Sequence, residues 1–328
     1  MGFELKEKNN PDTSITTTTT TTNNNDDNDN NSNSYRSITR IINSKETTEG
    51  AGFIVHRPFP NSSLSYFDPF ILLDEMGPMD VLSGEAKGAP DHPHRGFETV
   101  TYLLQGEFEH KDSNGNRGKL YPGDIQWMTA GSGVIHSEMP SKELLQKGGI
   151  LHGFQLWVNL PKKDKMIKPR YQDISAAKIP VAKTRDEKVI VRVIAGESLG
   201  VHSVTDTQTP IMYLHFTIQP EAEIVQQVPK EYNAFAYVIS GKGIFARNNT
   251  TDQDKIIQKD QMVVFGNDGT DVFIKSSANS ESPLEVLLIS GIPLNEPISQ
   301  YGPFVMNTQE EIHQAIDDYK SGKMGKIN

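Results

Sequence analysis

Two pairs of potential metal ligands, each pair separated by a single residue, are the main chemical signal in this sequence. His92 and His94 form the first pair, and His136 and Glu138 form the second. Residues i and i+2 of a β-strand point to the same face, so each pair can project together from one strand. If the two strands lie across a barrel from each other, the three imidazoles and the carboxylate converge. These donors suit a divalent transition metal, and a six-coordinate ion would keep two open positions.

The alternative interpretation is that these residues are polar side chains scattered over the surface of a sheet. A single His-x-His pattern would favour that interpretation. Here two pairs occur, and both lie beside glycines, Gly96 and Gly131 to Gly133, between runs that are typical of strands. We therefore favour a metal site over a solvated sheet surface.

The composition excludes several classes of site and partner. The chain has 328 residues, enough for two domains of ordinary size, with a net charge of −10 and a pI of about 5.4. This acidic balance argues against a broad basic surface, and we expect no direct nucleic-acid binding. The absence of cysteine excludes disulfides, iron–sulfur clusters and a cysteine nucleophile. No apolar stretch is long enough to span a bilayer, so we expect no membrane association.

The chain changes character at its thirty-fifth residue, Tyr35. Residues 1–34 are a low-complexity segment of Thr, Asn, Asp and Ser with few apolar side chains, which predicts a disordered tail. Beyond it, short β-branched and aromatic runs alternate with Gly, Pro, Asn and Asp, which predicts an all-β fold. The predicted strands include Phe53–Val55, Phe70–Leu73, Thr99–Leu104, Asp124–Met128, Gly153–Val158, Val189–Ile194, Ile211–Ile218, Ala234–Ile239, Met262–Phe265 and Leu284–Ile289.

The two halves of the strand-rich region share a plan. The segment Tyr102–Gly106 corresponds to Tyr237–Gly241, and each is followed by a turn, which indicates two β-barrels of one type. We expect an N-terminal barrel over residues 35–165 and a C-terminal barrel over residues 166–328. A short helix is predicted near the C-terminus, from Thr308 to Tyr319, where Glu311 completes a capping box with Thr308.

Several motifs carry a resemblance to a known family. His92, His94 and Glu98 fit the centre of the first cupin motif, and Gly131 to His136 fits the second loosely. The longer segments resemble the signature of the pirin family, from about Ser37 to about Tyr319. These segments are His92–Val100, Pro122–Gly131, His136–Pro140, Gln155–Leu160 and Pro297–Thr308.

The resemblance implies a bicupin, with two cupin-type antiparallel β-barrels and a short C-terminal helix. It also implies one ferrous ion (Fe2+) in the N-terminal barrel, held by His92, His94, His136 and Glu138. Glu98 competes with Glu138 as the carboxylate ligand, because many cupins use the glutamate of their first motif. The second half lacks a pair of histidines, so we expect its barrel to bind no metal.

Two functions follow from the resemblance. The first is quercetin 2,3-dioxygenase activity, with a flavonol and dioxygen as substrates and Glu138 as the catalytic acceptor of the flavonol hydroxyl proton. The second is a non-enzymatic role as a nuclear, redox-sensitive, metal-dependent cofactor that binds a transcription regulator. We expect a monomer located in the nucleus and cytoplasm.

Overall fold

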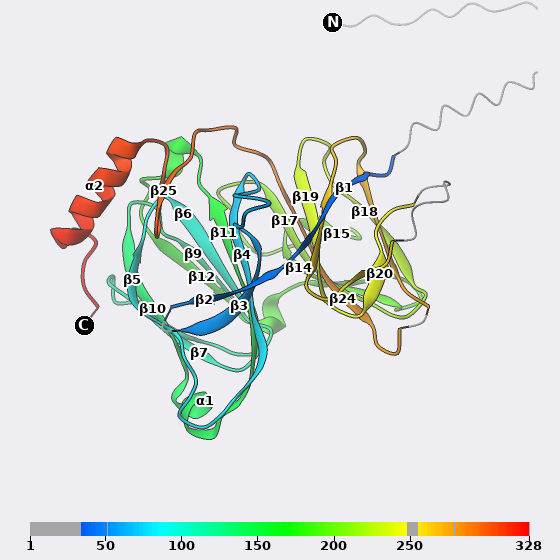
Figure 1. Ribbon diagram of the computed structural model, residues 1–328, viewed down its shortest axis with the longest axis horizontal. Helices are drawn as coiled ribbons and strands as arrows, with labels where there is room; N and C mark the ends of the chain where they lie inside the picture. Colours follow the sequence, from blue (N-terminus) through cyan, green and yellow to red (C-terminus); the bar gives the residue numbers. More distant parts are fainter. Residues whose placement is uncertain (1–33, 51, 248–254, 279, 328) are drawn as a thin grey trace, which may run out of the picture. The chain divides into compact units, whose positions relative to one another are not determined.

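The computed structural model describes residues 34–50, 52–247, 255–278 and 280–327. Apart from Ser34, the tail predicted over residues 1–34 lies outside these described residues. The fold is all-β, with two cupin barrels and a short C-terminal helix, as predicted (Figure 1). None of the described helices is both long and apolar enough to cross a membrane.

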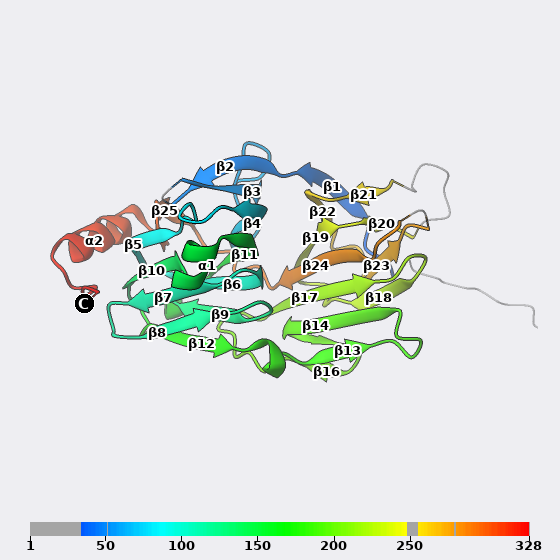
Figure 2. The same ribbon diagram turned by 90° about the horizontal axis from the view of Figure 1, so that it is seen from below.

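The first barrel consists of two antiparallel sheets. A seven-stranded sheet has the order β12-β9-β6-β11-β4-β3-β2, and a four-stranded sheet has the order β5-β10-β7-β8 (Figure 2). The strands are β2 (Lys45–Glu49), β3 (Phe53–Phe59), β4 (Phe70–Val81), β5 (Ala89–His94), β6 (Phe97–Gln105), β7 (Phe108–Asp112), β8 (Arg117–Leu120), β9 (Ile125–Thr129), β10 (Val134–Pro140), β11 (Gly149–Asn159) and β12 (Arg170–Ile174).

The second barrel repeats this arrangement. Its seven-stranded sheet has the order β1-β22-β19-β24-β17-β14-β13, and its four-stranded sheet has the order β18-β23-β20-β21. The strands are β1 (Ile38–Asn43), β13 (Val181–Lys183), β14 (Val189–Ala195), β17 (Ile211–Ile218), β18 (Glu223–Gln227), β19 (Asn233–Ser240), β20 (Lys242–Ile244), β21 (Ile257–Gln258), β22 (Gln261–Phe265), β23 (Asp271–Ser276) and β24 (Leu284–Gly291). The shared sheet plan confirms the repeat predicted from the sequence.

Short elements complete the described part of the chain. Two small ribbons pair β15 (Glu197–Ser198) with β16 (Val201–His202) and β25 (Ser299–Tyr301) with β26 (Phe304–Met306). The helices are α1 (Lys142–Lys147), α2 (Gln309–Lys320) and the 3-10 turns η1 (Lys162–Asp164) and η2 (Ala176–Lys178). The capping box predicted for α2 is present, because Thr308 and Glu311 exchange hydrogen bonds.

Both ends of the described chain cross between the barrels. Strand β1, near the N-terminus, pairs with β22 of the second barrel. The C-terminal hairpin returns to the first barrel, where Phe304 bridges to Arg95 (Figure 1). Strand β12 follows residue 165 yet pairs with β9 of the first barrel. The sheets therefore do not divide at the expected boundary between residues 165 and 166.

One apolar core is formed by both barrels together. It contains buried side chains of the first barrel, such as Tyr102 and Phe154, beside Tyr213, Phe235 and Ile289 of the second. The rings of Phe154 and Tyr237 meet edge to face with centroids 5.8 Å apart. This shared core packs the large sheet of one barrel against that of the other.

Candidate metal centre

The two histidine-bearing strands are neighbours in the small sheet of the first barrel. Strand β10 pairs with β5, and His136 lies directly opposite His92 in the register. The expectation that the strands face each other across the barrel was therefore wrong. Convergence arises instead because directly opposed residues of paired strands have adjacent side chains. One nitrogen from each of His92, His94 and His136 lies within 4.8 Å of the others, and we call these residues the histidine cluster.

Strand β5 is the edge of its sheet, and its sequence is suited to that place. Pro90 and Pro93 have no backbone N–H to donate to a neighbouring strand, which an edge strand tolerates. The carbonyl of Pro90 accepts a hydrogen bond of 2.7 Å from Nδ1 of His92. Because a carbonyl only accepts, His92 carries its proton on Nδ1, and its Nε2 carries the lone pair that a metal would bind.

Burial keeps two imidazoles of the histidine cluster neutral. His94 is 2% exposed and His136 is fully buried. Loss of solvation, followed by the neighbouring histidines, lowers the pKa of both His94 and His136 well below the ordinary value. Neutral imidazole is the form that binds metal ions.

Unsatisfied nitrogen atoms indicate that the histidine cluster fits a cation. Both ring nitrogens of His136 are buried and have no hydrogen-bond partner among the described residues. Nε2 of His92 and Nε2 of His94 lie 3.0 Å apart. Buried nitrogen atoms without partners are costly, and a bound divalent ion would take one nitrogen from each of the three rings.

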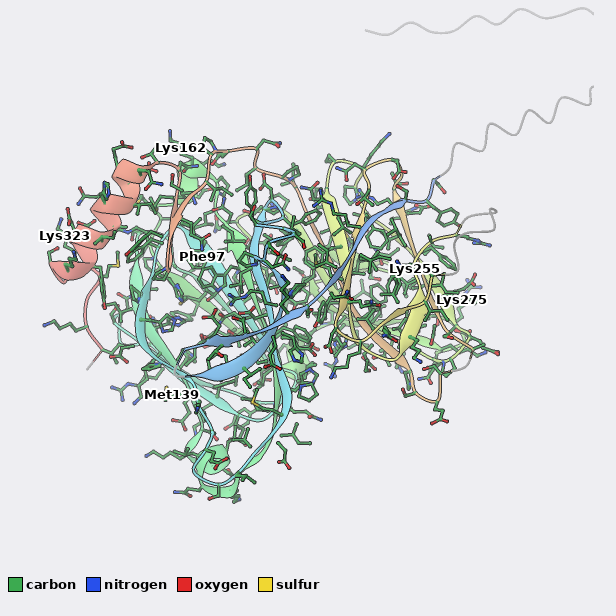
Figure 3. All side chains as sticks on the ribbon, viewed as in Figure 1. Phe97, Met139, Lys162, Lys255, Lys275 and Lys323 are labelled. Carbon is green, nitrogen blue, oxygen red and sulfur yellow. The ribbon has the colours of Figure 1, made fainter. Side chains whose placement is uncertain are left out.

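Aromatic side chains hold His94 in place. Its ring packs edge to face against both Phe97 and Trp157, with centroid distances of 5.1 and 5.3 Å. Those two rings also contact each other, with centroids 4.4 Å apart. Phe97, labelled in Figure 3, is fully buried in the first barrel. We interpret these contacts as packing that fixes the orientation of the imidazole.

Glu138 lies beside the histidine cluster but is held by other side chains. Thr101 donates a hydrogen bond of 2.8 Å to its Oε1, and Gln155 donates one of 3.0 Å to its Oε2. Thr101 and Gln155 are directly opposite each other on β6 and β11. The register of β10 against β5 shifts between His136 and Glu138, and the group of mutually close ligand atoms contains no oxygen of Glu138. Its role as a ligand stays a prediction.

Glu98, the competing carboxylate, is on the opposite face of β6 from Thr101. It is fully buried, and Thr129 donates a hydrogen bond of 2.6 Å to its Oε1. Burial raises the pKa of Glu98 to about 7, against the effect of the Thr129 hydrogen bond. Strand alternation places Glu98 on the same face as Val100 and Tyr102, which belong to the core shared by the barrels.

A cavity of about 520 Å³ opens onto the histidine cluster. This volume is within the range of about 300–1,000 Å³ that is typical of small-molecule sites. Polar and charged lining residues include His92, Glu138 and Arg57. Arg57 donates hydrogen bonds of 2.7 and 2.6 Å to Asp74, which satisfy much of its charge within the wall. The lining also includes Phe53, Leu72, Met76, Phe108, Trp157, Gly302 and Pro303.

Several residues of the site were not predicted from the sequence. Thr101 and Gln155 hold Glu138 by hydrogen bonds, yet neither the predicted strands nor the pirin-like segment Gln155–Leu160 indicated that role. Gly302 and Pro303 line the cavity although they are far along the chain from the other lining residues. The pirin-like segment that contains them was the only available signal.

In the second barrel, sheet order identifies the strands that correspond to β5 and β10. They are β18 and β23, which occupy the first two places of the equivalent four-stranded sheet. Neither Glu223–Gln227 nor Asp271–Ser276 contains a histidine. The expected absence of metal from this barrel stays a prediction.

Family models and related sequences all indicate the same family. The Pirin family model matches residues 52–158, and the Pirin C-terminal cupin domain matches residues 213–325. Pirin-like protein 2 of Arabidopsis thaliana is 47% identical, over 88% of this chain and 86% of that protein. Pirin of Homo sapiens is 43% identical, over 89% of this chain and 95% of that protein.

A solved structure shares both fold and sequence with the chain. It is described as quercetin 2,3-dioxygenase from Acinetobacter baumannii, and it is 35% identical with a TM-score of 0.81. The match covers 90% of this chain and all of that one. Together with the two cupin barrels, these matches show that the chain belongs to the pirin family.

Proposed function

We propose that this protein is an iron-dependent oxygenase that cleaves flavonols, with quercetin 2,3-dioxygenase activity. The observation that carries the proposal is the buried histidine cluster at the wall of a cavity of about 520 Å³ that Glu138 also lines. The similarity to the quercetin 2,3-dioxygenase of Acinetobacter baumannii supports the same reaction class.

The residues that would hold the ferrous ion are His92, His94, His136 and Glu138. The imidazoles of His94 and His136 are already neutral, so these two ligands need not lose a proton. A bound ferrous ion would supply the electron transfer that activates dioxygen, which protein side chains alone cannot provide.

The cavity suits a flat aromatic substrate. Leu72, Met76, Phe108 and Trp157 contribute apolar surface to its wall, and Trp157 also packs against His94. A flavonol inserted along this wall would bury its apolar surface against protein and away from water, which favours binding. The same contacts would keep bulk water away from the reacting carbons.

Glu138 is positioned to accept the proton of the flavonol 3-hydroxyl. Hydrogen bonds from Thr101 and Gln155 fix its carboxylate at the cavity wall. Proton removal prepares the flavonol for addition of dioxygen. Both oxygen atoms enter the organic product, two ring bonds to the 3-carbon break, and that carbon leaves with its oxygen as carbon monoxide.

The proposal is tested by the oxygen consumption of the iron-loaded protein with quercetin. The wild type should consume dioxygen as the flavonol absorbance falls, whereas the His94→Ala variant should act only at the rate of the protein-free control. His202→Ala, at an exposed site in the second barrel, is the matched control and should retain full activity. Equal rates for the wild type and the His94→Ala variant would contradict the proposal.

A further inference from the structure

A second group of potential metal ligands lies between the barrels, away from the histidine cluster. His56 is on β3 and Glu75 is directly opposite it on β4, both in the first barrel. Asp260 belongs to the turn that precedes β22 in the second barrel. One ligand atom from each of these residues lies within 4.8 Å of the other two.

The closest pair has the spacing of two ligands on one ion. Nδ1 of His56 and Oδ1 of Asp260 lie 3.4 Å apart. Two atoms bound to zinc at about 2.0–2.1 Å with a tetrahedral angle are roughly 3.4 Å apart. Adjacent ligands of an octahedral ion at about 2.1 Å would be only about 3.0 Å apart.

These two atoms are also buried without a hydrogen-bond partner among the described residues. The approach of His56 to Asp260 therefore does not have the geometry of a hydrogen bond. An ion pair in this geometry would leave both atoms without a hydrogen bond, which is costly at buried positions. A cation between them would satisfy both.

Glu75 is oriented as a metal-binding carboxylate would be. It is fully buried, and Nε2 of His152 lies 2.7 Å from its Oε1. Tyr237 of the second barrel donates a hydrogen bond of 2.6 Å to its Oε2. Carboxylates that bind metals are commonly held by such outer hydrogen bonds, which leave a further lone pair on each oxygen.

Asp260 is fixed by its backbone. Its carbonyl accepts a hydrogen bond of 2.8 Å from Ser44, and its N–H donates one of 3.1 Å to Val238. The side chains of His56 and Asp260 are 30% and 38% exposed, so a cation can reach the group from solvent. An entry path of this kind is required of a metal site.

We propose that His56, Glu75 and Asp260 form a second metal site, specific for a tetrahedral divalent ion such as zinc, that joins the two barrels. The metal capacity of the chain then becomes two, one more than the sequence predicted. Because two ligands come from the first barrel and one from the second, binding stabilises the contact between them. The site is independent of the proposed oxygenase function.

The test counts zinc bound by the full-length protein after removal of metals and dialysis against zinc chloride. We expect two zinc ions per wild-type chain and one per chain in the Asp260→Asn variant. Asn tolerates the left-handed backbone of this residue, where φ is 65°, so the turn should be preserved. The His94→Ala/His136→Ala variant should bind one zinc ion, and the combination of all three substitutions should bind none.

Thermal unfolding separates this site from adventitious surface binding. In the His94→Ala/His136→Ala background, zinc should raise the melting temperature by several degrees, and the added Asp260→Asn substitution should abolish that rise. The matched control is His202→Ala, which removes the exposed histidine that approaches Glu197 at 3.0 Å and should leave the zinc count unchanged. An equal zinc count with and without Asp260→Asn would overturn the proposal.

Discussion

At the scale of single residues, strand alternation decides which carboxylate faces the cavity beside the histidine cluster. Glu138 lines the cavity together with His92 and is held there by Thr101. Glu98 is on the face of β6 that points away from the cavity, where Thr129 donates a hydrogen bond to its Oε1. The two glutamates therefore lie in different surroundings, although both are near residues of the histidine cluster in the sequence.

Substitution of each glutamate should separate their roles. Glu138→Gln should weaken ferrous binding by at least about tenfold, the scale observed when a group that supports a metal is lost. Glu98→Gln should change the affinity less, because its side chain points toward the shared core. Competition with a metal-binding dye measures both affinities, and a larger loss for Glu98→Gln would show that the wrong carboxylate was chosen.

The protonation of Glu98 should make stability depend on pH. Burial raises the pKa of Glu98 to about 7 in the folded protein, above the ordinary value of 4.5. The folded state thus binds the proton more tightly, and the resulting stability is lost as pH rises from about 4.5 through about 7. The stability of the wild type relative to Glu98→Gln should fall by up to the order of 3 kcal/mol over this interval.

Urea unfolding of the metal-free proteins at several pH values measures this difference. Removal of metal eliminates the separate pH dependence of ion binding. If the stability of the wild type relative to Glu98→Gln stays constant with pH, or increases as pH rises, the buried environment assigned to Glu98 is contradicted.

The residue pattern predicted part of this site. The spacing of His92 and His94 was informative because the two-residue period of a strand is a local property. The hydrogen bonds of Glu138 could not be predicted, since they depend on the register of β6, β10 and β11. The burial of Lys165 could not be predicted either, because its ammonium group donates to Gly96, Asn159 and Val305, which lie far apart in the chain.

At the scale of elements, the C-terminal segment supports strand β5, which carries His92 and His94. Arg95 follows directly after β5 and donates hydrogen bonds of 2.9 Å to Asp318 on α2 and 2.7 Å to the carbonyl of Ser132. The next residue, Gly96, has a positive φ of 88°, and an added Cβ would lie 2.0 Å from the carbonyl oxygen of Val305. A side chain at this position would therefore separate β26 from the end of β5.

Loss of the Arg95–Asp318 pair should destabilise the protein strongly. Asp318→Ala leaves the buried guanidinium of Arg95 without its counter-charge, which should cost on the order of 3 kcal/mol. Lys323→Ala is the matched control, because it removes a largely exposed partner of the same carboxylate and should cost less than about 1 kcal/mol. Denaturant unfolding compares them, and equal losses would refute a structural role for the buried pair.

Element prediction succeeded where the signal was local. The strands predicted around β4, β6, β11, β17 and β24 are all present, because their apolar runs fill buried sheet positions. The turn that contains Asn114 and Gly115, a dipeptide typical of hairpins, joins β7 to β8. The placement of α2 against the first barrel had no local signal, since it depends on contacts between residues far apart in the chain.

At the scale of the whole molecule, the two barrels are packed into one continuous structure. The shared core, strand β1 and the C-terminal hairpin all connect them. The sequence repeat predicted two barrels of one type, but it could not reveal this exchange of chain ends. The repeat shows that the two barrels resemble each other. It does not show which barrel each end of the chain pairs with.

Calorimetry of the full-length, metal-free protein should therefore show a single unfolding transition. Exposure of the shared core by unfolding of either barrel would remove packing from the other. The ratio of calorimetric to van't Hoff enthalpy should be close to one. Two resolved transitions would show that the barrels unfold independently.

The most direct test of the central claim is the fate of isotopically labelled dioxygen. The iron-loaded wild type, supplied with quercetin and 18O2, should yield a ring-opened product that contains both labelled atoms, together with carbon monoxide. Mass spectrometry measures the label, and His94→Ala should give neither the product nor the gas above the protein-free control. Equal labelled product from wild type and variant, or a product with one labelled atom or none, would contradict a dioxygenase reaction at the histidine cluster.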